Sequence, residues 1–64
     1  MEDKNYQQYK RAAIMEAVNL LSVAHTKESI MAYMNGQEAE ETIREEYEEG
    51  MDSSSAAYCL YMMF

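Results

Sequence analysis

The sequence contains no proline, only two glycines and a single cysteine. Both glycines, Gly36 and Gly50, fall where helical patterns end. The lone cysteine excludes an intrachain disulfide, and Cys59 beside Leu60 is typical of a small buried hydrophobe. Valine, isoleucine and threonine are scarce and never alternate with polar residues, which disfavours strands. These absences point to a small, all-helical protein.

Catalytic and metal-binding patterns are also missing. The chain has one histidine, no Ser-His-Asp arrangement and no glycine-rich phosphate loop, so we expect no enzyme and no cofactor. The serines at 53–55 are typical of a helix start. A calcium loop with Gly50 at its sixth position would need a glutamate where Ala56 stands. His25 and Glu28 lie three apart without matching partners, so no metal site is predicted.

No segment carries the pattern of a signal peptide or a membrane span. Residues 1–6 are acidic and polar, whereas a signal peptide begins with basic and then apolar residues. The longest uncharged apolar run, 56–64, is far shorter than the roughly 20 residues that cross a bilayer as a helix. We therefore expect a soluble, cytoplasmic protein that does not bind a membrane.

Good helix formers dominate the sequence, and turn residues divide it into four segments. Helices are predicted over 4–24, 27–34, 37–49 and 53–63, with Thr26 and either Asp52 or Ser53 as N-caps. Apolar residues at helical spacing give the first helix a packing face. They are Tyr6, Tyr9, Ala13, Ile14, Ala17, Val18, Leu20, Leu21 and Ala24. The predicted fold is an all-α bundle of three to four short helices in one domain, 1–64, homodimeric or partner-bound.

The last segment is the most apolar part of the chain. No side of a helix over 56–64 is polar, and such a helix is normally buried all round. A chain this short buries only about 60% of its unfolded surface, so this helix either forms the centre of the domain or is shared with a second copy or a partner. Methionine and tyrosine, both abundant, are adaptable contact residues. The residues predicted for the core or an oligomer interface are Tyr47, Met51, Tyr58, Leu60, Tyr61, Met62 and Phe64.

The formal net charge is -7, and its distribution is uneven. Residues 1–27 carry four basic and three acidic side chains, a balance of +1, whereas residues 28–52 carry nine acids and one arginine, a balance of -8. Anionic charge of this size disfavours direct binding to nucleic acid or to an anionic membrane. The charge therefore favours a basic protein partner.

The predicted helix over 37–49 carries most of this negative charge, and the charge destabilises the helix. Like charges three or four residues apart each cost roughly 0.2–0.5 kcal/mol, and acids near the carboxyl end oppose the helix dipole. The pattern is typical of a solvated face or of a surface that meets cations. The residues predicted to contact a basic partner are Glu38, Glu41, Glu45, Glu48, Glu49 and Asp52.

These features predict a non-catalytic protein-binding module, an inhibitor or adaptor whose acidic helix docks on a basic protein surface. The basic surface could be one that binds nucleic acid in the absence of this protein, since carboxylates accept the same charge-assisted hydrogen bonds as phosphates. In size and charge the chain resembles the small acidic proteins that phages and mobile elements direct against host defence enzymes, which implies action by occupying a surface. The alternative is a structural or regulatory homo-oligomer that assembles through its apolar C-terminal helix, with the acidic face merely solvated.

Overall fold

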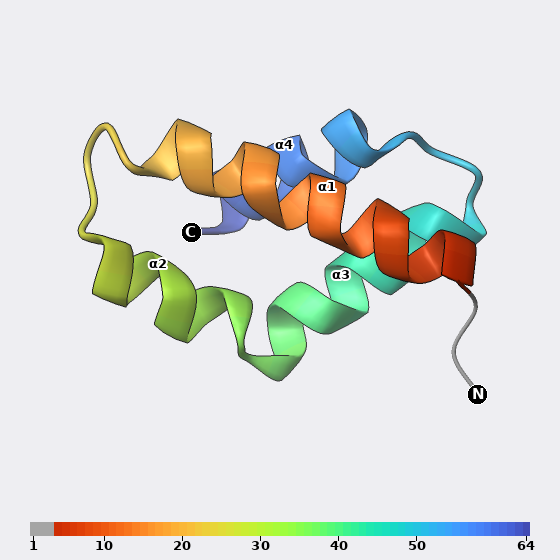
Figure 1. Ribbon diagram of the computed structural model, residues 1–64, viewed down its shortest axis with the longest axis horizontal. Helices are drawn as coiled ribbons and strands as arrows, with labels where there is room; N and C mark the ends of the chain where they lie inside the picture. Colours follow the sequence, from red (N-terminus) through yellow and green to blue (C-terminus); the bar gives the residue numbers. More distant parts are fainter. Residues whose placement is uncertain (1–3) are drawn as a thin grey trace.

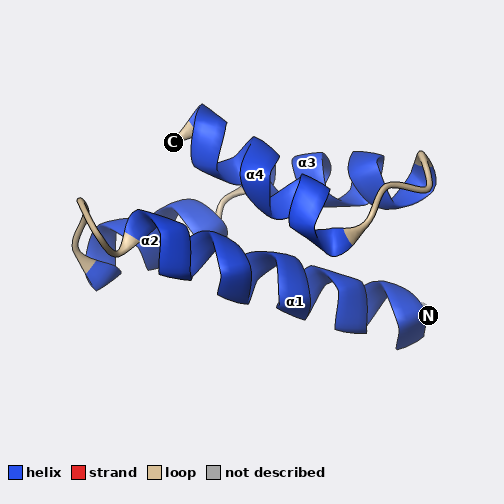
Figure 2. Cartoon of the chain, turned by 90° about the horizontal axis from the view of Figure 1, so that it is seen from above, coloured by secondary structure: helices blue, strands red, loops and turns tan. Residues whose placement is uncertain are grey.

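The computed structural model of the protein describes residues 4–64 as four helices joined by short turns (Figures 1 and 2). α1 spans Lys4–Leu21, α2 spans Lys27–Met34, α3 spans Gln37–Glu48 and α4 spans Ser53–Met63. No strand occurs among residues 4–64, so the predicted all-α fold is confirmed. The helices form one body with principal extents of 32 × 21 × 16 Å. Whether this body pairs with a second copy or a partner stays a prediction.

The long helix α1 organises the other three. Its most extensive contact is with α4, and α4 also packs along α3. In Figure 1, α2 and α3 form a V beneath α1, and α4 lies behind α1. Figure 2 shows α1 and α4 running side by side, with α3 on the far side of α4. α3 contacts α1 from Glu40 to Tyr47, and it contacts α4 at Thr42 and Glu46.

Each helix contributes one large side chain to the centre of the core. Leu21, Ile30, Ile43 and Leu60 are the largest fully buried side chains, and they come from α1, α2, α3 and α4 respectively. The remaining fully buried positions are small. They are Ala13, Ala17, Ala39, Ala56 and Ala57. Because α1 and α4 each bring two of these alanines, their axes can approach closely along the longest seam of the bundle.

The helix ends agree with the turn residues of the sequence, with two differences. The Thr26 hydroxyl accepts from the Ser29 N–H at 3.2 Å, and the Asp52 carboxylate accepts from the Ser55 N–H at 2.9 Å, so both predicted N-caps are confirmed. α3 ends at Glu48, one residue earlier than predicted. α1 ends at Leu21 rather than at residue 24.

The early end of α1 has a local cause. The Ser22 hydroxyl donates to the Asn19 carbonyl at 3.0 Å, and the Ala24 N–H donates to the Leu21 carbonyl at 3.1 Å, which tightens the last turn. The predicted packing face is correspondingly shorter. Ala24 lies exposed beyond the helix, and Leu20 keeps 40% of its surface exposed.

Candidate partner-binding surface

α3 presents most of its carboxylates to solvent because its buried positions are few. Ala39 and Ile43, four residues apart, are the positions that this helix buries completely, and they set its inner side. Five glutamates on the outer side are exposed. They are Glu38, Glu41, Glu45, Glu48 and Glu49, and together they form the acidic stripe. None of these five carboxylates makes a hydrogen bond or an ion pair with another residue of the 4–64 segment.

Asp52, the sixth acid predicted to contact a partner, lies beyond the stripe and has a structural role. Its side chain is exposed, but one carboxylate oxygen caps α4 by accepting from the Ser55 N–H. Its backbone carbonyl also accepts from the Tyr9 hydroxyl at 2.9 Å, which ties the start of α4 to α1. Burial, followed by the charges of Glu46 and Asp52, raises the pKa of Tyr9. Asp52 therefore holds the turn between α3 and α4 as well as adding charge.

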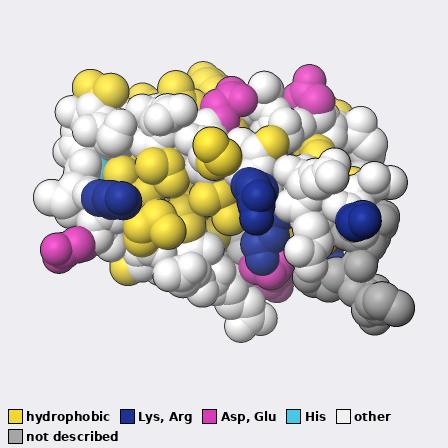
Figure 3. All heavy atoms as spheres, viewed as in Figure 1, with side chains coloured by type: hydrophobic (Ala, Val, Ile, Leu, Met, Phe, Trp, Pro, Cys, Tyr) yellow, Lys and Arg dark blue, Asp and Glu magenta, His cyan; other side chains and the backbone are white. Residues whose placement is uncertain are grey.

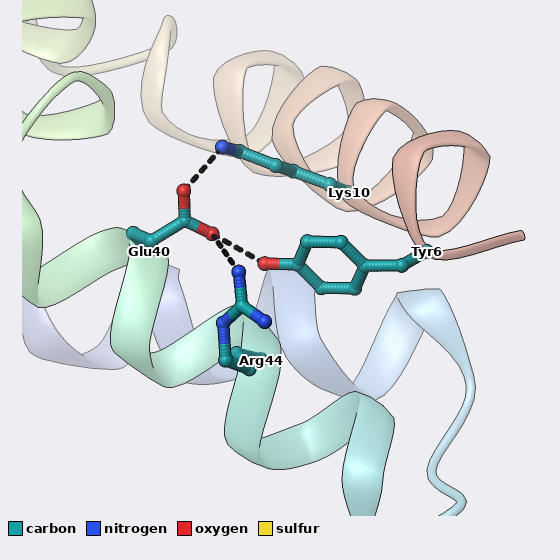
Figure 4. Close-up of polar contacts among 4 residues, drawn as sticks. All are labelled: Tyr6, Lys10, Glu40 and Arg44. Atoms are coloured by element: carbon teal, nitrogen blue, oxygen red, sulfur yellow. Dashed lines mark hydrogen bonds and ion pairs between the residues drawn. The ribbon is translucent and has the colours of Figure 1, made fainter. Parts of the chain in front are cut away.

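Glu40 points inward and belongs to a different environment from the stripe (Figure 4). Its carboxylate accepts from the Tyr6 hydroxyl and from the Lys10 ammonium, the latter at 2.6 Å, and Arg44 lies 3.9 Å away on the next turn. The bonds from Lys10 and then Tyr6 hold the pKa of Glu40 below its usual range. The spacing of four residues favours the pair of Glu40 with Arg44, whereas no local pattern indicates the two bonds from α1.

Glu46 is the second acid of α3 that the stripe excludes. Its carboxylate accepts from the Ser55 hydroxyl at 2.9 Å and so joins α3 to the first turn of α4. Cys59, one turn further along α4, is half-buried beside it. Burial, and then the charge of Glu46, raises the pKa of the Cys59 thiol. A raised pKa disfavours the thiolate, which is the reactive form of cysteine. Cys59 is half-buried, whereas the sequence led us to expect a buried side chain.

The carboxyl end of α3 is closed by backbone bonds despite its acids. Gly50 has φ +80°, its N–H donates to the Tyr47 carbonyl at 3.1 Å, and the Met51 N–H donates to the Glu46 carbonyl at 3.0 Å. This pair of bonds is a Schellman motif, in which glycine supplies the left-handed residue. The motif fixes the direction in which the chain leaves α3 and turns into α4.

The predicted core or oligomer residues separate into three groups. Leu60 is fully buried in the core. Tyr47 and Phe64 pack against other aromatic rings: Tyr47 lies edge-on to Tyr6 and Tyr9 at about 5 Å, and Phe64 contacts Tyr33 and His25. The remaining four are exposed, as is Phe64, at 39%, despite its ring contacts. These four are Met51, Tyr58, Tyr61 and Met62.

α4 buries only one side, which corrects the expectation that it could form the centre of the domain. Its buried positions are Ala56, Ala57 and Leu60, all facing α1 and α3. On its outer side Tyr58, Tyr61 and Met62 are 59%, 43% and 67% exposed, and the two tyrosine rings lie 6.1 Å apart. These three residues form the apolar strip. No polar residue in this part of α4 marks the outside, so the sequence could not separate the two faces.

Cations gather on a different part of the molecule. In Figure 3, apolar side chains lie over α1 and α2, with lysine and arginine side chains beside them. An open groove of about 350 Å³ runs along α1 and is lined by Gln7, Lys10, Arg11, Ile14 and Met15. The Lys10 ammonium at its edge is bound to Glu40. No carboxylate, histidine or cysteine lines this groove.

The other polar side chains singled out from the sequence have structural contacts. The Ser54 hydroxyl donates to the Glu16 carboxylate at 2.9 Å, and His25 packs edge-on to Phe64 at 4.3 Å. Within residues 4–64 no three His, Cys, Asp or Glu side chains converge as metal ligands, and no polar or charged residue is buried. No helix in the described part of the chain is both long and apolar enough to cross a bilayer.

Comparison with known proteins returned no match: the chain matches no protein-family model, no curated protein and no solved structure.

Proposed function

We propose that this chain is a non-catalytic binding protein, an inhibitor or adaptor that acts in the cytoplasm by docking its acidic stripe on a basic protein surface. The observation that supports this proposal is the division of the carboxylates of α3. Glu40 and Glu46 have partners within the chain, whereas all five residues of the stripe are exposed and have none. A stripe that destabilises its own helix and receives no internal compensation is suited to an external cation.

The spacing of the stripe suits a surface that otherwise holds nucleic acid. Its five carboxylates lie between positions 38 and 49, so at 1.5 Å per residue they recur about every 4 Å along the helix axis. Phosphates recur at about 3.4 Å along one strand of duplex DNA. Lysine and arginine side chains placed for phosphates can therefore reach successive carboxylates, with which they form charge-assisted hydrogen bonds.

The test is the variant Glu41→Gln/Glu45→Gln/Glu48→Gln/Glu49→Gln, compared with Glu28→Gln, which removes one exposed acid from α2. The immobilised wild-type chain should retain basic cytosolic proteins at low salt, release them at high salt and lose them to competing duplex DNA. The quadruple variant should retain none of these proteins, while Glu28→Gln behaves as wild type. Removing the repulsion should also raise the free energy of unfolding by about 1–2 kcal/mol. Equal retention by the quadruple variant would contradict the proposal.

The exposed apolar strip supports a second candidate, a structural or regulatory homo-oligomer that assembles through α4. Truncation after Cys59 would be a poor test, because Leu60 belongs to the core and its loss would unfold the chain. The variant Tyr58→Gln/Met62→Gln changes only exposed side chains. Sedimentation equilibrium should show an oligomer that this variant dissociates if the second candidate is correct, and a monomer in both cases if the first is correct.

A further inference from the structure

The apolar strip and the acidic stripe lie on neighbouring helices. Two contacts set the register between them: the Ser55 hydroxyl donates to Glu46 at 2.9 Å, and the Thr42 hydroxyl donates to the Met63 sulfur at 3.4 Å. α3 and α4 are therefore antiparallel, with positions 46 and 42 of α3 beside positions 55 and 63 of α4. This line of contact between α3 and α4, called the seam below, extends over most of α4.

Helical periodicity places the exposed residues of both helices just outside this seam. On α3, Glu45 and Glu49 follow Thr42 and Glu46 by three residues, so they lie next to these two residues, on the solvent side of the edge that faces α4. On α4, the apolar strip occupies the solvent side of the same helix whose other edge carries Ser55, Cys59 and Met63. The charges of Glu49 and Glu45 also reach the Cys59 thiol, which agrees with this arrangement. An anionic border therefore runs along one side of the apolar strip.

The apolar strip is large enough to matter for binding. An aromatic side chain contributes about 150–250 Å² when buried, so the exposed fractions of the three residues correspond to about 300 Å². This area is at the lower end of the roughly 300–600 Å² of the largest apolar patch on a typical monomer, and such patches are often functional. An area of about 300 Å² is well below the roughly 800 Å² per partner of a standard interface, so neighbouring surface must contribute.

The anionic border decides which occupant fits. An interface between two copies related by a two-fold axis uses the same surface on both, so an anionic border would have to meet a cationic border of that surface. The cations of the chain lie elsewhere: Lys10 and Arg44 are directed at Glu40, and Lys4, Arg11 and Lys27 lie on α1 and at the start of α2. A second copy adds a charge of -7 and no matching cations at the strip.

We infer that the apolar strip and the acidic stripe together bind one amphipathic basic segment of a partner protein. Apolar side chains at helical spacing on the segment would cover Tyr58, Tyr61 and Met62, and flanking lysines or arginines would reach Glu45 and Glu49. The inference rests on the proposed function and extends it: the partner supplies an ordered apolar face as well as positive charge. A uniformly basic surface would leave the strip uncovered.

The test uses two synthetic peptides of about 18 residues, long enough to form a helix on binding. Both contain only leucine and lysine in equal proportion; one places the leucines on one helical face, and the other has the same composition in scrambled order. Fluorescence anisotropy with the 64-residue chain should give a dissociation constant for the amphipathic peptide that is lower by about tenfold or more. Tyr58→Gln/Met62→Gln should remove that preference, whereas Met15→Gln, at a 62% exposed position on α1, should keep it.

The acidic variants separate this inference from the proposed function. Glu45→Gln/Glu49→Gln should weaken binding of both peptides and reduce its dependence on salt, and Glu28→Gln should do neither. If the acidic variant weakens binding but both peptides bind equally, the inference is wrong and the proposed function stands. If neither peptide responds to the acidic variant, both are wrong. A wild-type dimer that Tyr58→Gln/Met62→Gln dissociates would assign the apolar strip to a second copy and overturn the inference.

Discussion

Glu40 and Glu41 are neighbours in the sequence and lie in opposite environments. Glu40 is half-buried and accepts bonds from Tyr6 and Lys10, with Arg44 nearby. Glu41 is exposed on the acidic stripe and has no partner within residues 4–64. The charge of α3 is therefore divided: at the inner edge a carboxylate bonds to α1, whereas the exposed carboxylates repel one another and those near the carboxyl end oppose the helix dipole.

The same division runs through α4. Leu60 is fully buried, whereas Met62, two residues later, is 67% exposed. Both helices therefore have an inner side that stabilises the bundle and an outer side that contributes little to it. The comparison predicts that substitutions on the inner sides reduce stability, and that substitutions of the same kind on the outer sides act on binding instead.

The largest expected effect comes from truncating the inner side of α4. Leu60→Ala should lower the free energy of unfolding by about 2–5 kcal/mol, because it removes buried methyl groups and leaves a cavity. Met62→Ala, on the outer side, should change it by no more than about 0.5 kcal/mol. Urea denaturation followed by circular dichroism measures both. Similar losses for the two variants would show that α4 is covered on both sides, as in an oligomer.

The next effect concerns the inner edge of α3. Hydrogen bonds to a charged group contribute about 1.5–3 kcal/mol and exposed ion pairs about 0.2–1 kcal/mol. The side chain of Glu40 is 34% exposed, so we expect Glu40→Gln to lower the free energy of unfolding by an intermediate amount, about 1–2 kcal/mol. Glu41→Gln is the matched control and should leave stability equal or slightly raised, since it removes a repulsive charge. An equal loss in both variants would remove the distinction between the two sides.

Acidification tests the same bonds. Because the pKa of Glu40 is lower in the folded protein than in the unfolded chain, its contribution is fully present above the unfolded pKa and is lost as the pH falls through the folded pKa. The stability difference between wild type and Glu40→Gln should therefore be constant near neutral pH and shrink below about pH 4. A difference that persists unchanged in acid would mean that the bonds of Glu40 do not depend on its charge.

Local signals in the sequence predicted much of this arrangement. The caps at Thr26 and Asp52 and the left-handed Gly50 are decided by residues within one turn, so the sequence placed three of the helix boundaries. The spacing of four residues between Ala39 and Ile43 also indicates the inner side of α3, which buries both. The six acids predicted to face a partner are all exposed: five lie away from that inner side, and Asp52 lies in the turn before α4. Their binding role stays a prediction.

Two features could not be predicted from the sequence because tertiary packing decides them: the environment of Glu40 and the buried side of α4. Glu40 sits at the edge between the two sides of α3, and its environment depends on which helix lies beside that edge; Lys10 and Tyr6 are thirty or more residues away in the chain. α4 lacks polar residues after Ser55, so no periodicity distinguished Leu60 from Met62. Both features follow from the position of α1, which no short-range pattern reveals.

The smallest expected effect on the free energy of unfolding comes from replacing a tyrosine by phenylalanine at either of two positions, Tyr6 and Tyr33. The Tyr6 hydroxyl donates to Glu40, whereas the buried Tyr33 hydroxyl has no hydrogen-bond partner among residues 4–64, and burial together with the charge of Glu38 raises the pKa of Tyr33. Tyr6→Phe should lower the free energy of unfolding by about 1 kcal/mol, because it removes a bond to a charged acceptor. Tyr33→Phe should raise it by up to about 1 kcal/mol, because it removes a polar group that is desolvated without compensation. Opposite signs in urea denaturation would locate the stabilising polar contacts at the inner edge of α3, and a loss in both variants would show that Tyr33 also depends on its hydroxyl.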